Sequence, residues 1–180
     1  MDAFSKPELL ALLTAARARS ERDWLMILVA YTHGLRASEV LELTPAQLDG
    51  EFLLVERLKG SERTTQPIFD NPEPLLSERQ ALIDLVRRTP GNQKLFPVSR
   101  KTFWRRMQRY GRAAGLPAHK LHPHALKHSC ARQLIDSAGI HRTQAWLGHK
   151  SMASTGKYLK ASDEEVAAAA RRALGGVDSD

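Results

Sequence analysis

The hydrophobic positions in the first third of the chain recur at helical spacing. One apolar stripe consists of Leu9, Leu10, Leu12 and Leu13. The capping-box pattern Ser5-Lys6-Pro7-Glu8 precedes it, so we expect a first helix that ends near Ala18. A second apolar series, from Trp24 to Tyr31, predicts a helix that begins near Glu21 and stops at Gly34. A short third helix should cover residues 37–43.

The pattern changes to strands after residue 50. Residues 52–55 are a run of β-prone apolar residues, and 64–69 form a second strand in which Pro67 implies an edge position. A polar turn at 59–63 joins the two strands. Helical spacing returns at 77–88, 100–114 and 123–137, where Pro90, Gly115 and Gly139 mark the breaks. Shorter helices are expected over 142–147, 151–159 and 163–174.

These elements predict a mainly α-helical domain with one small antiparallel sheet, an α+β fold. A chain of 180 residues with 42% hydrophobic content can bury one core. The sequence contains no repeat, low-complexity linker or domain break. We therefore expect a single domain over residues 1–180.

The charge balance favours a polyanion as partner. Lysine and arginine number 27 against 20 acidic residues, which gives a net charge of +7 and a pI near 9.9. The single cysteine, Cys130, excludes an internal disulfide framework and fits a reducing compartment. The first ten residues lack the apolar core of a signal peptide, and no apolar run reaches membrane-spanning length. We expect a cytoplasmic protein with no membrane partner.

The chain carries a set of groups suited to attack on a phosphodiester. These groups are one tyrosine, two histidines and two cations: Tyr158, His124, His149, Arg36 and Lys127. A phenol oxygen can displace a DNA strand end if cations hold the phosphate oxygens and another group protonates the departing alcohol. No acidic catalytic pair accompanies them.

The segment H-x-x-K-H also invites a zinc interpretation. His124 and His128 lie one helical turn apart, with His122 close by. The general-base glutamate of an H-E-x-x-H helix is absent, because Ala125 stands in its place. We therefore expect no metal at this segment.

Several of these segments resemble the catalytic domain of the tyrosine recombinases, the phage integrase family, whose fold is related to type IB topoisomerases. The string THGLRASE is similar to the family's first arginine box, HPHALKHS to its second, and LGH to its third. Five of the six expected groups occur in order between residues 32 and 158. The hairpin LKGSERTTQPI looks most like that of the small fimbrial-switch invertases.

The resemblance implies a role for each group. Four residues would surround the scissile phosphate and neutralise its charge: Arg36, His124, Lys127 and His149. Tyr158 would attack to form a 3′-phosphotyrosyl bond while Lys59, at the hairpin tip, protonates the released 5′ oxygen. Glu39 would be a buried carboxylate supporting Arg36. The phosphotyrosine stores the bond energy, so no cofactor is implied, and family members work as four protomers on two double-stranded DNA sites.

The chain departs from the family pattern in two places. Lys127 stands where the second box usually has arginine, and lysine loses the bidentate grip on two phosphate oxygens. The loss of one charge-assisted bond costs roughly 1.5–3 kcal/mol of transition-state stabilisation, or about ten- to a hundredfold in rate. In addition, only 35 residues precede Arg36, and they read as the start of the catalytic domain. We expect no amino-terminal DNA-clamping domain, either in a minimal recombinase or in a fragment.

The helix expected over 100–112 has a basic face. Its cations recur at three- and four-residue spacing: Lys101, Arg105, Arg109 and Arg112. The opposite side holds Phe103, Met107 and Tyr110, with Trp104 towards its edge. This basic face is either solvated or in contact with phosphates along a DNA groove.

The resemblance implies a site-specific DNA recombinase, and two other classes stay open. A non-catalytic DNA-binding regulator of the same fold would keep the basic face and tolerate Lys127. A nicking-closing enzyme of the type IB topoisomerase kind would use the same chemistry without pairing two sites.

Overall fold

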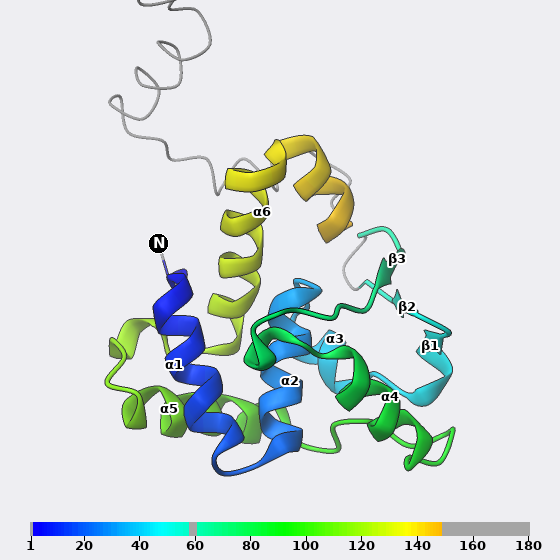
Figure 1. Ribbon diagram of the computed structural model, residues 1–180, viewed down its shortest axis with the longest axis horizontal. Coiled ribbons are helices and arrows are strands. Elements are labelled where there is room, and N and C mark those ends of the chain that lie inside the picture. Colours follow the sequence, from blue (N-terminus) through cyan, green and yellow to red (C-terminus); the bar gives the residue numbers. More distant parts are fainter. Residues whose placement is uncertain (1, 58–60, 149–180) are drawn as a thin grey trace, which may run out of the picture.

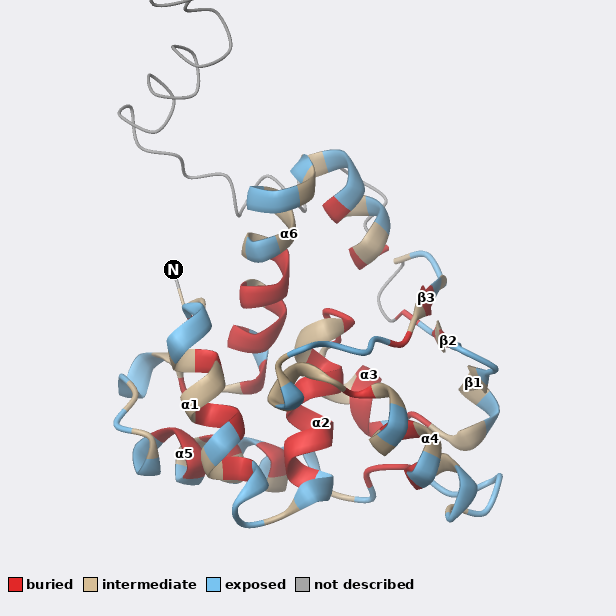
Figure 2. Ribbon diagram, viewed as in Figure 1, coloured by how far each residue is buried: buried red, intermediate tan, exposed pale blue. Residues whose placement is uncertain are grey.

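The first two helices form a pair that supplies the centre of the core (Figure 1). The computed structural model describes residues 2–57 and 61–148. Helix α1 (Lys6–Arg17) begins at the predicted capping box, where the backbone N–H of Ser5 donates to Glu8 Oε2 at 2.7 Å. Helix α2 (Glu21–Thr32) is buried without interruption over residues 23–30, and Figure 2 shows it as the buried centre of the molecule. Both predicted helices are confirmed.

A small antiparallel sheet lies on one side of these helices (Figure 1). Its strands β1 (Leu48–Asp49), β2 (Phe52–Val55) and β3 (Thr64–Pro67) pair in the order β1-β2-β3. Pro67 therefore lies in an edge strand, as predicted, and the strand ends there rather than at residue 69. Strand β1 was not predicted, because two residues are too few to show an alternating pattern.

The remaining helices surround the pair. They are α3 (Ala37–Leu41), α4 (Arg79–Arg87), α5 (Arg100–Ala113) and α6 (Pro123–Leu147). Single turns of 3₁₀ helix at Pro45–Gln47, Pro74–Leu76 and Ala118–Lys120 complete the described part. Gly139 breaks α6 with φ 80° and ψ 169°, so its two halves correspond to the two predicted helices. The fold is mainly helical with one small antiparallel sheet, as predicted, and the helices expected over 151–159 and 163–174 lie outside the described residues.

A buried polar link holds the sheet against the helices. His33, at the end of α2, lies 2.7 Å from Gln66 Oε1 on β3 and 2.8 Å from Glu78 Oε1 before α4. The amide of Gln66 also donates to the carbonyl of Trp146 at 2.6 Å. These bonds fix the end of α2, the sheet edge and the end of α6 relative to one another.

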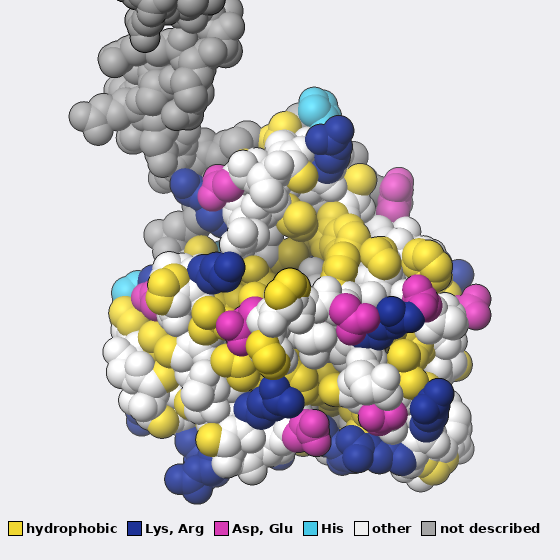
Figure 3. Space-filling view, viewed as in Figure 1, with side chains coloured by type: hydrophobic (Ala, Val, Ile, Leu, Met, Phe, Trp, Pro, Cys, Tyr) yellow, Lys and Arg dark blue, Asp and Glu magenta, His cyan; other side chains and the backbone are white. Residues whose placement is uncertain are grey.

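The surface of the face seen in Figure 1 is mixed in character. Hydrophobic side chains gather below α6, and basic and acidic side chains are scattered over the lower part (Figure 3). Phe69 is 37% exposed, and its ring centroid lies 5.9 Å from that of Trp146. None of the described helices is long and apolar enough to cross a membrane.

Candidate active site

The turn between α2 and α3 is the structural centre of the candidate site. Gly34 adopts φ 59°, and a Cβ added there would lie 2.4 Å from Leu147 Cδ2, so both conformation and space require glycine. Its carbonyl accepts hydrogen bonds from Arg57 Nη1 at 3.0 Å and from Lys127 Nζ at 2.9 Å. One backbone oxygen therefore joins the strand end after β2, the α2–α3 turn and α6.

Arg36 begins α3 and is held by Glu39, one helical turn further on. Its Nη1 donates to Glu39 Oε1 at 2.6 Å, and its backbone N–H donates to Oε2 at 2.7 Å. The side chain of Arg36 is 27% exposed, whereas that of Glu39 is 1% exposed. Glu39 is thus the buried carboxylate that the sequence predicted, and Arg36 reaches the surface beside it.

Lys127 is buried inside the site. The residue is 2% exposed, and its Nζ donates to the carbonyl of Gly34. Burial and the neighbouring charge of Arg57 lower the pKa of Lys127 to about 7, while Glu39 acts in the opposite direction. The ammonium therefore titrates near neutral pH and lies against the backbone two residues from Arg36.

Three histidines occupy the start of α6. His122 caps the helix, since its Nδ1 accepts from the backbone N–H of Ala125 at 3.2 Å. The rings of His124 and His128 meet edge to face, with centroids 4.2 Å apart. Loss of hydration and the charge of Lys127 lower the pKa of His124, and loss of hydration with the neighbouring His124 lowers that of His128 to about 4. His124 is exposed, and its lowered pKa favours the neutral imidazole at neutral pH.

A groove of about 660 Å³ connects these groups to helix α5. It is lined from three elements: Arg36, Ala37, Ser38, Arg100, Lys101, Trp104, His122, Pro123 and His124. The structure thus brings Arg36 and His124 to one surface. Lys127, on α6, lies beneath this surface, where it is bonded to the carbonyl of Gly34. Phosphate-sized anions would meet two arginines, a lysine and two imidazoles in this groove.

The indole of Trp104 belongs to this groove and not to the core. The residue is 47% exposed, so it lies beyond the edge of the apolar side, towards which the sequence placed it. Phe103, Met107 and Tyr110 carry the buried side of α5 instead. Trp104 follows Arg100 by four residues, which puts the two on one face of the helix beside the candidate site.

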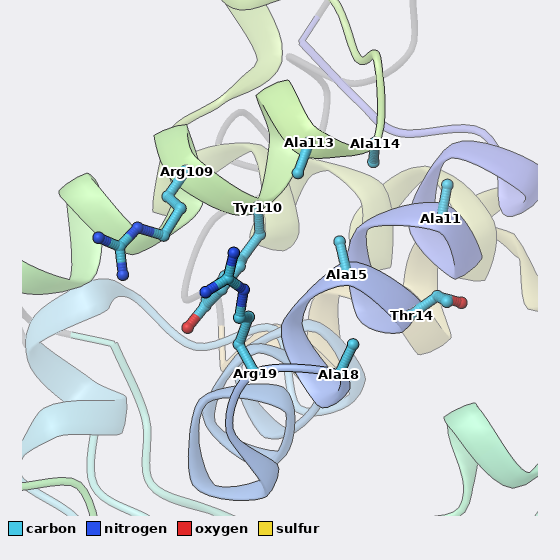
Figure 4. Close-up of a pocket in the computed structure, with 9 residues that line it drawn as sticks. All are labelled: Ala11, Thr14, Ala15, Ala18, Arg19, Arg109, Tyr110, Ala113 and Ala114. Atoms are coloured by element: carbon cyan, nitrogen blue, oxygen red, sulfur yellow. The ribbon is translucent and has the colours of Figure 1, made fainter.

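The basic residues of α5 face two different hollows. All four predicted cations, Lys101, Arg105, Arg109 and Arg112, are exposed. Lys101 lines the groove beside Arg36, whereas Arg109 lines a second hollow of about 490 Å³ between α1 and α5. Figure 4 shows the side chains of Arg109 and Arg19 at one side of this second hollow, whose other walls are mostly alanines. The predicted face is continuous along the helix but spans both hollows.

Three predicted site residues, Lys59, His149 and Tyr158, lie outside the described residues. The described backbone next to them converges, because Glu62 N–H donates to the carbonyl of Gly148 at 2.9 Å. A Cβ added at Gly148 would lie 2.4 Å from the carbonyl oxygen of Glu62, so the two backbones touch. Among the described residues, no group of three or more histidine, cysteine or acidic side chains could hold a metal ion.

The sequence interpretation missed one residue at the centre of the site. Arg57 is buried and donates to the carbonyls of His33, Gly34 and Trp146. A signal for it exists, because Leu53 and Val55 are buried in β2 and Arg57 continues their alternation by two residues. An arginine in phase with a buried strand face is a candidate for a structural or catalytic ion pair.

The sequence profile of the phage integrase family matches residues 3–165. The chain belongs to the phage integrase family. Tyrosine recombinase XerA of Pyrococcus furiosus is 37% identical over 164 residues, which cover 84% of this chain and 54% of that protein. Tyrosine recombinase XerD of Vibrio cholerae serotype O1 is 29% identical over 177 residues, covering 90% and 58%. The chain thus spans little more than half the length of these relatives.

Solved structures of this family share the fold. The crystal structure of XerA recombinase superposes with a TM-score of 0.74 at 21% identity, covering 96% of this chain and 63% of that one. A lambda integrase dimer bound to a COC′ core site gives 0.71 at 22% identity, covering 89% and 49%. The arrangement of helices and sheet is therefore that of the integrase catalytic domain, as the sequence resemblance implied.

Proposed function

We propose that the protein is a tyrosine-type site-specific recombinase that cuts and rejoins DNA through a 3′-phosphotyrosyl intermediate. The observation that carries the proposal is the groove that holds Arg36 and His124 in a member of the phage integrase family. Arginine supplies two parallel hydrogen bonds to phosphate oxygens, and Glu39 holds its guanidinium in place. Such preorganised donors stabilise the charge that develops as a phosphodiester is attacked.

In the proposed mechanism, Tyr158 attacks the phosphorus and the 5′ oxygen of the broken strand leaves with a proton from Lys59. Arg36, Lys127 and His149 stabilise the pentacovalent phosphorane, and His124 accepts the proton that the Tyr158 hydroxyl gives up as it attacks. A 5′ hydroxyl from a partner strand then attacks the phosphotyrosine, releases the tyrosine oxygen and joins the new strands. One phosphodiester is broken and one is formed, so the exchange needs neither ATP nor a metal ion.

The proposed partners are double-stranded DNA and further copies of the chain. The exposed cations of α5 run from the groove to the α1–α5 hollow and could follow the phosphates of a duplex. Lambda integrase has been solved as a tetramer bound to a Holliday junction, and this chain shares its fold with a TM-score of 0.71. We expect four protomers on paired sites for a complete exchange.

The placement of Lys127 favours one second candidate, a DNA-binding regulator without catalysis. Its ammonium is buried against the Gly34 carbonyl and does not line the groove. A regulator would tolerate such a lysine, since duplex binding needs no stabilisation of a transition state. In a recombinase, Lys127 would contribute in one of two ways. Either DNA binding draws its amine towards the phosphate, or its charge acts on the phosphate from behind Arg36.

Trapping on nicked DNA separates the two candidates. A pool of duplexes with randomised sequence and a nick near the centre loses the 5′ strand fragment after cleavage, so the protein stays attached to the 3′ end. We expect a denaturant-resistant adduct from the wild-type chain, whereas a regulator yields bound DNA that denaturant releases completely. Selected sequences, placed in pairs on one plasmid, then distinguish recombination from nicking and closing.

A further inference from the structure

Arg57 is a buried arginine at the point where three segments of the candidate site meet. It follows strand β2, and its side chain has no exposed surface. Its Nη1 donates to the carbonyl of Gly34 at 3.0 Å, and its Nη2 donates to those of His33 at 3.0 Å and Trp146 at 2.9 Å. The guanidinium therefore ties the end of β2 to the α2–α3 turn and to the last turn of α6.

A buried guanidinium is costly, so its presence needs a physical account. Burial lowers the pKa of Arg57, and the carboxylate of Glu39, 3.5 Å from Nη1, raises it again. A hydrophobic residue would continue the buried alternation of Leu53 and Val55 at a lower desolvation cost. The three carbonyls instead accept from the two terminal nitrogens of the guanidinium, and the carboxylate faces Nη1, while Nε has no hydrogen-bond partner among the described residues.

Glu39 links Arg57 to the first phosphate-binding residue. Its Oε1 accepts from Arg36 Nη1 at 2.6 Å, while Oε2 accepts from the Arg36 backbone and faces Arg57 Nη1. The two arginines thus pair with different oxygens of one carboxylate, and Arg57 is the buried one. Arg57 therefore contacts the carboxylate that holds Arg36 at the groove.

The carbonyl of Gly34 links Arg57 to Lys127. Both cations donate to this oxygen, at 3.0 Å and 2.9 Å, so their nitrogen atoms lie within about 6 Å of each other. The charged groups around Lys127 are Arg57 from the strand end, Arg36 and Glu39 from the α2–α3 turn and α3, and the thiol of Cys130 on α6. Burial raises the pKa of Cys130 to about 12, so this thiol is neutral.

We propose that Arg57 is a positioning residue for the phosphate-binding cations, which directs Arg36 through Glu39 and sets the place and charge of Lys127 through the Gly34 carbonyl. Only the cleavage test of this inference rests on the proposed function. A second readout, on the folded protein without DNA, keeps its failure distinguishable from a failure of the proposed function. The role differs from plain structural support because it predicts how Lys127 titrates.

The first test compares the pH dependence of cleavage in three variants with that of the wild type. Cleavage of limiting nicked duplex, selected as above, should fall as pH rises through about 7, because free enzyme loses the Lys127 proton there. In Arg57→Gln, this decline should move upward by about one pH unit, since a like charge is removed. In Glu39→Gln the decline should move to lower pH, since a negative charge is removed. In Arg57→Lys the charge is kept, so the decline should stay in place while the cleavage rate falls at least about tenfold.

The second test follows the same proton in the absence of DNA. The pKa of Lys127 is lower in the folded than in the unfolded chain, so its titration makes stability rise with pH from about 7 towards 10.5. The difference in unfolding free energy between wild type and Lys127→Met isolates this contribution. In the Arg57→Gln background, the rise should begin at a higher pH.

Arg106→Gln serves as a matched control. Arg106, on α5, donates to Asp23 on α2 at 2.5 Å, and its described contacts include neither Glu39 nor Gly34. It should lower the melting temperature without moving either pH profile. The proposal is overturned if Arg57→Gln lowers the rate and the stability but leaves both profiles in place. If Arg57→Gln does not fold, Arg57→Lys decides. A wild-type cleavage rate in Arg57→Lys would overturn the role of the guanidinium. A tenfold lower rate whose decline stays near pH 7 would support it.

Discussion

Single residues carry the parts of the site that are easiest and hardest to foresee. Arg36 and Glu39 could be predicted together, because a carboxylate three residues after a helix-starting arginine reaches back to its guanidinium. The burial of Lys127 could not, since it depends on the Gly34 carbonyl, 93 residues away in the chain. The spacing placed Trp104 only near the edge of the apolar side, because the neighbouring groove decides how far such a boundary residue is exposed.

Lys127 gives the first prediction. Lys127→Ala should lower the single-turnover cleavage rate about ten- to a hundredfold at pH 6, where the wild-type ammonium is charged. At pH 8, with limiting DNA, about a tenth of the amine stays protonated in the free enzyme, so the advantage of the wild type should shrink about tenfold. Duplex affinity should change much less than cleavage.

Lys127→Arg is the companion variant, since arginine cannot lose its proton in this range. It should preserve or raise the rate and abolish the decline near pH 7, because the second hydrogen bond to phosphate is restored. A lower cleavage rate in Lys127→Arg than in wild type would mean that the residues around Gly34 have adapted to the shorter side chain of lysine. Equal rates for Lys127→Ala and wild type at both pH values would remove Lys127 from the site.

At the scale of elements, the helices followed from local signals and the tertiary contacts did not. Ser5 and Ser20 cap α1 and α2, and Ser99 caps α5, so each start could be placed from the sequence. Gly34 and Gly139 mark a helix end and a helix break through their left-handed backbone. The groove between α3, α5 and α6 had no local signal, because each element contributes only a few residues to it.

The basic face of α5 carries the second prediction. Replacement of Lys101, Arg105 and Arg109 by alanine should weaken duplex binding and flatten the slope of log affinity against log salt by about three. Single variants should each change the slope by about one unit, since each removes one phosphate contact. Arg87→Ala, on α4 outside both hollows, is the control. Fluorescence anisotropy over a range of salt gives the slopes, and an unchanged slope in the triple variant would return this face to solvent.

The contact between the α2–α3 turn and α6 carries the third prediction. Gly34→Ala combines a left-handed backbone with a Cβ 2.4 Å from Leu147 Cδ2, so it should lower the free energy of unfolding by about 2–4 kcal/mol. Gly91→Ala meets nothing within 4 Å and should stay within about 0.5 kcal/mol of wild type. Urea unfolding followed by circular dichroism measures both, and equal stability of the two variants would contradict the account of the turn.

At the scale of the whole molecule, the fold and the family could be inferred from the chain because the three boxes recur in order over most of its length. What the sequence could not supply is the way in which the boxes are joined. A buried arginine after β2, one carbonyl and one carboxylate connect the hairpin, the α2–α3 turn and the end of α6. The hydrogen bonds of Arg57 to Gly34 and Trp146 join residues 23 and 89 positions apart, and only the folded chain brings them together.

The central claim is that a tyrosine of this chain becomes covalently joined to DNA. The most direct measurement is mass spectrometry of the adduct trapped on nicked duplex, after nuclease and protease digestion, together with the Tyr158→Phe variant. We expect a nucleotide attached through a 3′ phosphate to the peptide that contains Tyr158, and no adduct from Tyr158→Phe, whose duplex affinity stays close to that of wild type because only the attacking oxygen is lost. An adduct that persists in Tyr158→Phe, or a nucleotide found on another residue, would contradict the account.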